Sequence, residues 1–136
     1  MFAGFDTSNY TTSVALFDGE NIIQRKKLLT VKQGERGLRQ SDAVFQHTVN
    51  MPELINSLDL DNINIKAVGV SNKPRNAQGS YMPCFLVGEN TANAVSAFTS
   101  SPLHKTSHQV GHILSALYSA CLLYTSDAAD DLIGVD

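Results

Sequence analysis

The sequence contains no tryptophan and only two cysteines, Cys84 and Cys121, among its 136 residues. Two cysteines cannot form the disulfide framework of a small secreted domain, so we expect a reducing compartment. No apolar run approaches the roughly 20 residues that a membrane helix needs. The first residues also lack the basic stretch and apolar core of a signal peptide. These absences favour a cytoplasmic protein.

Charge is sparse, at 17% of residues, and the net charge is −3. The sequence therefore has no overall basic character, and contact with a nucleic acid would need a local basic patch or a partner protein. Hydrophobic residues make up 43% of the chain, which is typical of a globular protein and argues against disorder. The length predicts one domain with an ordinary core.

The end of the chain needs separate treatment. Residues 121–131 read CLLYTSDAADD, which matches the translation of a transposase sequencing adapter. We therefore expect 1–120 to be the native and incomplete part, and 121–136 to be a non-native, adapter-derived tail. The alternative is a native helix that ends in an acidic segment.

The opening of the chain predicts three strands joined by two turns. A short apolar run at 2–5 is followed by a polar turn at 7–10, and alternation at 12–17 indicates a second strand. The pair Asp18-Gly19 is typical of a hairpin turn. The returning strand is expected within 21–31.

A helix is expected from Ser41, a plausible N-cap, to about residue 58. Pro52 should kink or divide it, and 32–40 reads as a loop. The apolar stripe predicted to face the core consists of Val44, Val49, Leu54, Ile55 and Leu58.

The remainder alternates between strands and helices. We expect a buried strand at 65–70, a polar loop at 71–80, an extended segment at 103–107 and a helix at 108–120. Between them, Pro83 can occupy the first turn of a helix that runs to about residue 98. This order predicts an α/β layer fold. The inward side chains of the helix after Pro83 are expected to be Phe85, Leu86, Val87, Ala92 and Val95.

The most chemically informative segment contains His108 and His112. Residues four apart on a helix share one face and lie about 6 Å apart, so two imidazoles there can chelate one divalent transition metal. Protein metal sites typically need three or more protein donors, so further ligands must come from elsewhere. Gln109 rules out a zinc-protease signature with a general-base glutamate, and no metal role is expected for His104. The alternative is a polar helix start capped by Ser107.

A second polar segment follows the first strand, which ends at Asp6. The residues Thr7, Ser8, Asn9 and Thr11 place hydroxyls and backbone N–H groups in one turn. Such a turn can hold a phosphate or another anion. The alternative is ordinary Asx- and Ser/Thr-turn chemistry, which only satisfies the chain reversal.

Four segments together resemble a known family. Residues 4–8, Gly-Phe-Asp-Thr-Ser, are similar to the family opening Gly-Ile-Glu-Thr-Ser, and His47 matches a recurring histidine. Residues 70–88 resemble a Gly-Pro-Gly loop and the helix after it, and 108–112 are similar to a His-x-Glu-Gly-His metal motif. Their order and spacing agree with the N-terminal lobe of the threonylcarbamoyl-transferase family. Members are also known as O-sialoglycoprotein endopeptidases or tRNA N6-threonylcarbamoyladenosine synthases.

The resemblance implies a truncated N-terminal lobe of the sugar-kinase/heat-shock-protein/actin type of nucleotide-binding fold. It implies that His108 and His112 bind one divalent metal, iron or zinc, which an aspartate of the C-terminal lobe completes. ATP or threonylcarbamoyl-adenylate would be bound mainly by that same lobe, with Thr7, Ser8, Asn9 and Thr11 as candidate contacts in this chain. The reaction implied is transfer of a threonylcarbamoyl group to N6 of adenosine in tRNA, supported by accessory proteins and by a dimer formed through the N-terminal lobe.

The sequence departs from the family at several positions. Asn9, Tyr10 and Thr11 stand where the family has Cys-Asp-Glu, and Val110 replaces the glutamate between the histidines. The loop at 72–75 carries two cations in place of small residues, and these can reach phosphate or RNA backbone. These losses leave Asp6 as the remaining candidate for a catalytic carboxylate.

Two functions therefore stay open for this sequence. The first is a divergent transferase, which we expect to be inactive as this chain alone because the nucleotide-binding lobe is missing. The alternative is a non-catalytic partner or scaffold subunit that pairs with a true threonylcarbamoyl transferase. A metallopeptidase is disfavoured because no general-base glutamate flanks the histidines.

Overall fold

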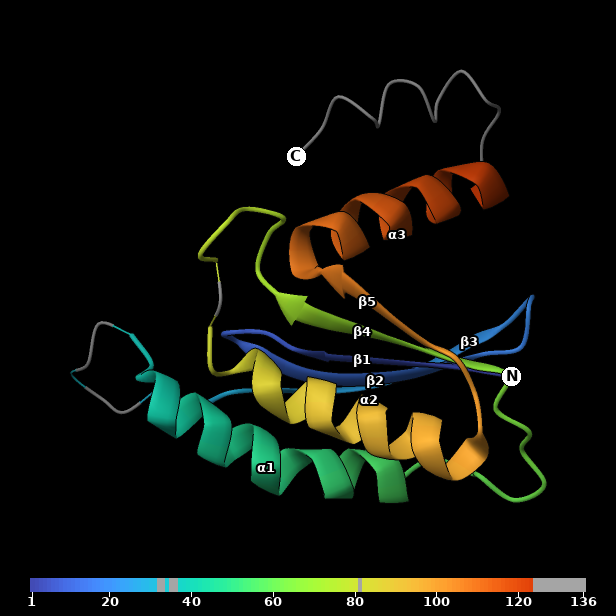
Figure 1. Cartoon of the computed structure of the whole chain (residues 1–136), viewed down its shortest axis with the longest axis horizontal. Coiled ribbons are helices and arrows are strands. Elements are labelled where there is room, and N and C mark those ends of the chain that lie inside the picture. The colour runs from blue at the N-terminus through green and yellow to red at the C-terminus, as the bar shows by residue number, and fades with distance from the viewer. Residues whose placement is uncertain (32–33, 35–36, 81, 124–136) are drawn as a thin grey trace.

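The structure, a computed structural model, describes residues 1–31, 34, 37–80 and 82–123. A five-stranded sheet has helices on both faces, with α1 and α2 on one side and α3 on the other (Figure 1). This arrangement is the expected α/β layer fold. The elements are β1 (Phe2–Thr7), β2 (Thr11–Phe17), β3 (Ile22–Leu28), α1 (Gln40–Asn56), β4 (Ala67–Lys73), α2 (Phe85–Thr99), β5 (Leu103–Ser107) and α3 (His108–Leu123).

The strand order in the sheet is β3-β2-β1-β4-β5. The first three strands form an antiparallel meander. After crossovers through α1 and α2, β4 pairs in parallel with β1, and β5 pairs in parallel with β4. The predicted hairpin is confirmed: Asp18 Oδ1 accepts the backbone N–H groups of Glu20 at 2.8 Å and Asn21 at 2.6 Å. Gly19 has φ of 105°, a conformation that favours glycine.

The main core lies between the sheet and helices α1 and α2. Alternation along β1 turns Ala3, Phe5 and Thr7 toward these helices and leaves Gly4 and Asp6 on the face toward α3. Alternate residues of a strand therefore pack in the core, and the residues between them face α3 on the other side of the sheet. The buried hydrophobic cluster consists of Ala3, Phe5, Val14, Leu16, Met51, Leu54, Leu58, Val68, Val70 and Ala92.

Helix α1 differs from its prediction in three ways. It begins at Gln40 after Arg39, with no side-chain cap, so the assignment of Ser41 as N-cap is wrong. Pro52 lies inside one continuous helix and does not divide it. The expected stripe is only partly buried because Val49 is 53% exposed. The face toward the sheet consists instead of Ala43, His47, Asn50, Met51 and Leu54, two of which are polar and invisible to a hydrophobicity pattern.

Strand β4 and helix α2 also shift. Strand β4 runs to Lys73, into the segment predicted as a loop, and α2 begins at Phe85, after Pro83. Leu86, predicted to face inward, is 42% exposed, whereas Gly88 is buried against β1. A Cβ at Gly88 would lie 2.9 Å from Thr7 Oγ1, so the close packing of α2 on β1 requires glycine.

The last elements follow the prediction. Strand β5 spans the expected extended segment, and α3 begins at His108 as expected. Helix α3 continues to Leu123, past the proposed boundary at residue 120, and that boundary stays a prediction. Within the described part of the chain, no helix combines the length and apolar character needed to cross a membrane. The expected loop at 32–40 lies partly outside the described residues.

Candidate metal and ligand site at the start of helix α3

The parallel part of the sheet brings the two chemically informative segments together. Strands β1, β4 and β5 end at the same edge, where ligand sites of α/β sheets occur. His108 follows β5 directly, and Asp6 lies near the end of β1, 102 positions earlier in the sequence. The start of α3 is held by Ser107, whose Oγ accepts the N–H of Val110 at 3.0 Å, which confirms the predicted cap.

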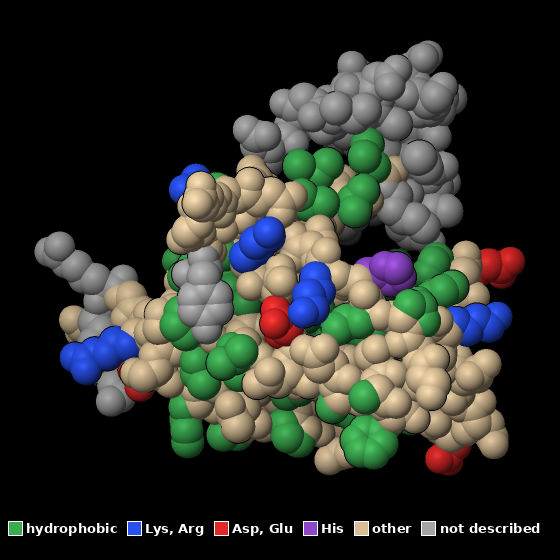
Figure 2. All heavy atoms as spheres, in the orientation of Figure 1, with side chains coloured by type: hydrophobic (Ala, Val, Ile, Leu, Met, Phe, Trp, Pro, Cys, Tyr) green, Lys and Arg blue, Asp and Glu red, His purple; other side chains and the backbone are tan. Residues whose placement is uncertain are grey.

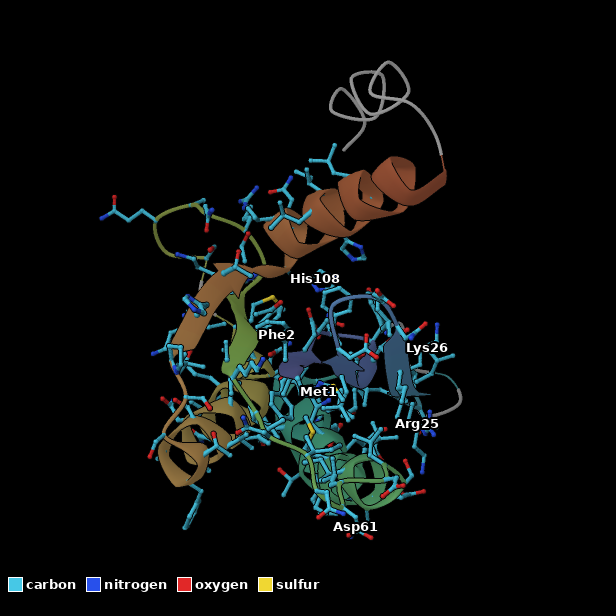
Figure 3. The ribbon with its side chains drawn as sticks, turned by 90° about the vertical axis from the view of Figure 1, so that its right-hand side faces the viewer. Met1, Phe2, Arg25, Lys26, Asp61 and His108 are labelled. Carbon is cyan, nitrogen blue, oxygen red and sulfur yellow. The ribbon has the colours of Figure 1, made fainter. Side chains whose placement is uncertain are left out.

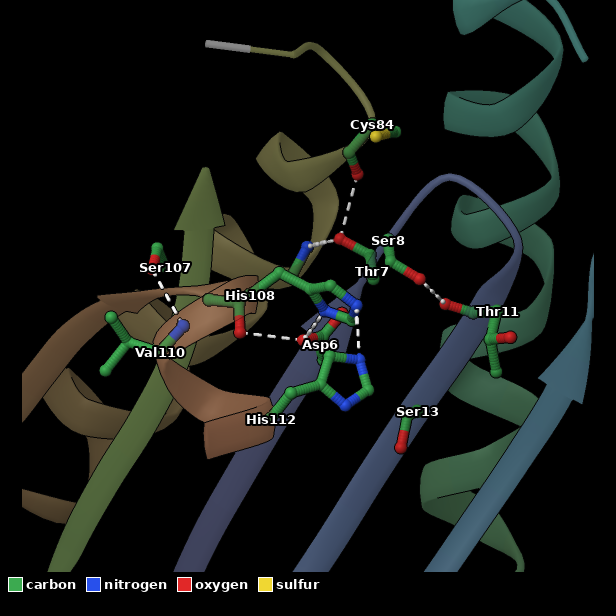
Figure 4. A network of polar contacts seen from close by, with 12 residues as sticks. Asp6, Thr7, Ser8, Thr11, Ser13, Cys84, Ser107, His108, Val110 and His112 are labelled. Atoms are coloured by element: carbon green, nitrogen blue, oxygen red, sulfur yellow. Dashed lines mark hydrogen bonds and ion pairs between the residues drawn. The ribbon is translucent and has the colours of Figure 1, made fainter. Parts of the chain in front are cut away.

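Asp6 orients His108. Its Oδ2 lies 2.7 Å from His108 Nδ1 (Figure 4). The same oxygen accepts the hydroxyl of Ser71 at 2.7 Å. A carboxylate can only accept, so Nδ1 carries the hydrogen and Nε2 of the neutral ring is left with a free lone pair. This carboxylate–histidine arrangement is the one that usually supports a metal-binding imidazole from behind.

The second histidine meets the first one helical turn later. His112 Nε2 lies 2.8 Å from His108 Nε2, and the two rings are nearly perpendicular, at 89° with centroids 4.3 Å apart. With both rings neutral, His108 Nε2 accepts and His112 Nε2 donates. The two nitrogens therefore converge on one point, as the spacing of the pair predicts, and a cation bound there would replace that hydrogen.

A polar pocket of about 460 Å³ opens beside the histidines. It brings together the predicted residues Asp6, Ser8, Thr11, His108 and His112. Five residues that also line it were not singled out as contacts: Tyr10, Gly111, Ser13, Gln24 and Lys26. The position of Ser13, Gln24 and Lys26 could have been predicted from the hairpin turn at Asp18-Gly19. The turn fixes which residues of the second and third strands lie opposite each other.

Thr7 and Asn9 do not face this pocket. Thr7 is fully buried, and its hydroxyl donates to Cys84 O at 2.8 Å and accepts the N–H of Gly88 at 3.0 Å. Thr7 therefore packs between β1 and α2, outside this pocket. Asn9 Oδ1 accepts Gln40 Nε2 at 2.8 Å, which ties the opening turn to α1.

His47 of α1 hydrogen-bonds the turn between β1 and β2 from the side of the sheet that α1 covers. It is fully buried, with Nε2 2.7 Å from Ser8 O and Nδ1 2.7 Å from Thr12 Oγ1. A carbonyl can only accept, so Nε2 carries the hydrogen, and Thr12, which accepts Asn50 Nδ2 at 3.2 Å, donates to Nδ1. Burial lowers the pKa of His47 below 6.5 and favours this neutral form.

The described residues bring together no more than two candidate metal donors, His108 and His112. Within residues 1–31, 34, 37–80 and 82–123, no group of three or more His, Cys, Asp or Glu side chains is placed to hold a metal ion. Asp6 stands behind His108 and therefore does not add a ligand. Lys73, one of the two basic residues in the segment 72–75, lines a different pocket. That pocket is formed with Asn72 and the loop that follows β4. On the face shown in Figure 2, lysine and arginine side chains are scattered and form no basic patch.

Comparison with known proteins agrees with this fold. No family model matches the chain. Two curated tRNA N6-adenosine threonylcarbamoyltransferases align over 119 residues: the Campylobacter fetus protein at 29% identity and the Campylobacter concisus protein at 31% identity. Each alignment covers 85% of this chain and 34% of the relative. Among solved structures, YeaZ from Pseudomonas aeruginosa matches with a TM-score of 0.52 and 14% identity, over 90% of this chain and 48% of that chain.

The sheet order and the helices on both faces resemble the N-terminal lobe of an actin-like fold. The chain is a distant homologue of the tRNA N6-adenosine threonylcarbamoyltransferases. It spans about a third of the length of those relatives.

Proposed function

We propose that this chain takes part in the transfer of a threonylcarbamoyl group to N6 of adenosine in tRNA, with His108 and His112 as two ligands of a divalent metal, iron or zinc. The observation that carries the proposal is the convergence of the two Nε2 atoms at 2.8 Å, with His108 oriented by Asp6. The distant homology to threonylcarbamoyltransferases supports the choice of reaction.

The donor set fits such a metal. Imidazole nitrogens suit zinc and iron, and the carboxylate on Nδ1 leaves Nε2 of His108 available. The part of the relatives that this chain does not span would supply the remaining protein ligand. When bound, a divalent cation provides positive charge for oxygens that become negative during acyl transfer.

The chain's own residues would position the acyl donor. Ser8 and Thr11 line the pocket beside the histidines and offer hydroxyls to ATP or threonylcarbamoyl-adenylate. Most contacts to that nucleotide would come from the unmatched two-thirds of the relatives. The adenine amine is a poor nucleophile, so close positioning of donor and tRNA supplies much of the rate enhancement. Asp6 acts as a positioning residue here because its Oδ2 is already engaged by His108 and Ser71.

A second candidate function is a non-catalytic partner that pairs with a true threonylcarbamoyl transferase, for instance as a dimer through this lobe. One observation favours it: Tyr10, Thr11 and Val110 stand where the family that the sequence resembles has acidic residues in its motifs.

Metal binding separates the two functions. Calorimetric titration of the chain with Zn²⁺ and, separately, with Fe²⁺ should show one ion bound per chain, and elemental analysis should give the same stoichiometry. His108→Ala and His112→Ala should each weaken binding by about tenfold or more. His104→Ala is the matched control because this exposed histidine lies on β5 outside the pocket. Absence of binding, or equal binding by all variants, would favour the scaffold function.

A further inference from the structure

A row of polar residues crosses the sheet on the face toward α3. In the strand register, Asp6 of β1 lies opposite Ser13 of β2, and Ser13 lies opposite Lys26 of β3. Side chains that face each other in neighbouring strands point to the same side of the sheet. On the other side of Asp6, Ser71 of β4 extends the row through its hydrogen bond. The row therefore begins at Lys26 and leads to the residues that orient His108.

Lys26 and its neighbour Lys27 lie on opposite faces of the same strand. Lys27 faces α1 and forms an ion pair with Glu53 at 3.3 Å. Lys26 lines the pocket that contains His108 and His112. In the side view, Lys26 lies on the side of β3 toward α3 and Arg25 on the side toward α1 (Figure 3). No ion pair to Lys26 occurs among the described residues, so its ammonium group is available to a ligand.

The dimensions of the site allow one ligand to reach both ends of the row. Neighbouring strands are about 4.8 Å apart, so the backbones of Lys26 and Asp6, two strands apart, are separated by about 10 Å. The pocket between them, about 460 Å³, falls within the range of small-molecule sites. Gln24 lines the same wall and hydrogen-bonds Ser13 Oγ at 3.1 Å, which makes this wall polar.

We propose that Lys26 binds the anionic oxygen group of the ligand whose reacting end lies at His108 and His112. Lys26 is thus a specificity-determining residue that sets the orientation of the ligand across the sheet. The identity of that ligand rests on the proposed function: the anionic group is either the carboxylate of the threonylcarbamoyl group or the phosphate of the adenylate. An acyl donor with neither group would lose this contact.

The test compares two variants that remove the same charge from adjacent positions. The full chain, Lys26→Gln and Lys27→Gln are titrated with N-carbamoyl-L-threonine and, separately, with AMP. Each titration is done with and without Zn²⁺ and followed by ¹H–¹⁵N NMR shifts. Lys26→Gln should weaken binding of one of these anions by about five- to tenfold, while Lys27→Gln should match the unmodified chain. The anion affected identifies the source of the negative charge.

Equal weakening by both variants, or no weakening by either, would overturn the proposal, as would failure of both anions to bind in a saturable way. The outcome is separable from that of the proposed function. Anion binding that depends on Lys26 without any Zn²⁺ binding would support the anion site and contradict the metal-dependent reaction. Zn²⁺ binding through the histidines, together with anion binding that does not change in Lys26→Gln, would support the metal site and contradict the anion site.

Discussion

His47 and His108 lie on opposite faces of the same sheet, and each uses both ring nitrogens. The partners of His47 are a backbone carbonyl and a hydroxyl, and the ring is fully buried. The partners of His108 are a carboxylate and a second imidazole, and its side chain is 32% exposed. Both nitrogens of His47 are enclosed by the protein, whereas His108 Nε2, which contacts only a second imidazole, lies at the edge of a pocket.

The difference teaches that residue type and motif do not by themselves assign a role. The sequence resemblance predicts a family role for both histidines, yet His47 hydrogen-bonds the opening turn and His108 faces the pocket. The face of the sheet decides between these roles, and strand parity fixes the face. The same rule separates Thr7 from Asp6 on β1 and Lys27 from Lys26 on β3.

The largest expected effect on stability comes from His47. His47→Ala leaves the carbonyl of Ser8 and the hydroxyl of Thr12 without their partner in a buried space, which should lower the free energy of unfolding by about 2–4 kcal/mol. His108→Ala, at the pocket edge, should cost less than about 1 kcal/mol. Urea denaturation of both variants measures the contrast. Equal costs would mean that the two faces are not distinct in the way described.

The pH dependence of stability should follow His47 as well. Burial holds the pKa of His47 in the folded chain below 6.5, the value expected in the unfolded chain. At a pH between the folded and the unfolded pKa, the unfolded chain therefore binds a proton that the folded chain does not. The contribution is fully present above pH 6.5 and is lost as the pH falls toward the folded pKa. Unfolding free energies measured from pH 7.5 to 5 should decrease toward acid, and less steeply in His47→Gln. Identical slopes for the two proteins would show that His47 is not held neutral.

Removing the carboxylate behind His108 should affect metal binding more than folding. Asp6→Ala frees the His108 ring to rotate and to change tautomer, so Zn²⁺ affinity should fall by about tenfold or more. Ser71→Ala, which removes only the second hydrogen bond to Asp6, should have a smaller effect. Calorimetric titration of both variants gives the comparison, and unchanged affinity in Asp6→Ala would contradict the positioning role.

The smallest effect is expected at Cys84. Burial raises the pKa of its thiol to about 11, so almost no thiolate exists near neutral pH. In a Cys121→Ser background, a thiol reagent at pH 7.5 should modify the folded chain far more slowly than the chain in urea. Rapid modification of the folded chain would show that the packing of α2 on β1 opens easily.

Local signals predicted the order of elements and the histidine pair. The Asp18-Gly19 turn, the alternation in the first strands and the i, i+4 spacing of the histidines each depend on neighbours in the sequence. The burial of His47 and Asn50, the contact of Gly88 with Thr7 and the position of Lys26 depend on segments distant in the sequence. Ser41 was misassigned because many polar residues can precede a helix, and Leu86 because apolar character alone does not fix which face of α2 meets the sheet.

The most direct test of the central claim is X-ray absorption at the zinc edge of the Zn²⁺-loaded chain. The structure predicts two imidazole nitrogens at about 2.0–2.1 Å, with oxygen ligands completing the shell. The imidazole signal should be lost in the double variant His108→Ala/His112→Ala and retained in His104→Ala. A zinc spectrum without imidazole, or one unchanged in the double variant, would contradict a metal site at the start of α3.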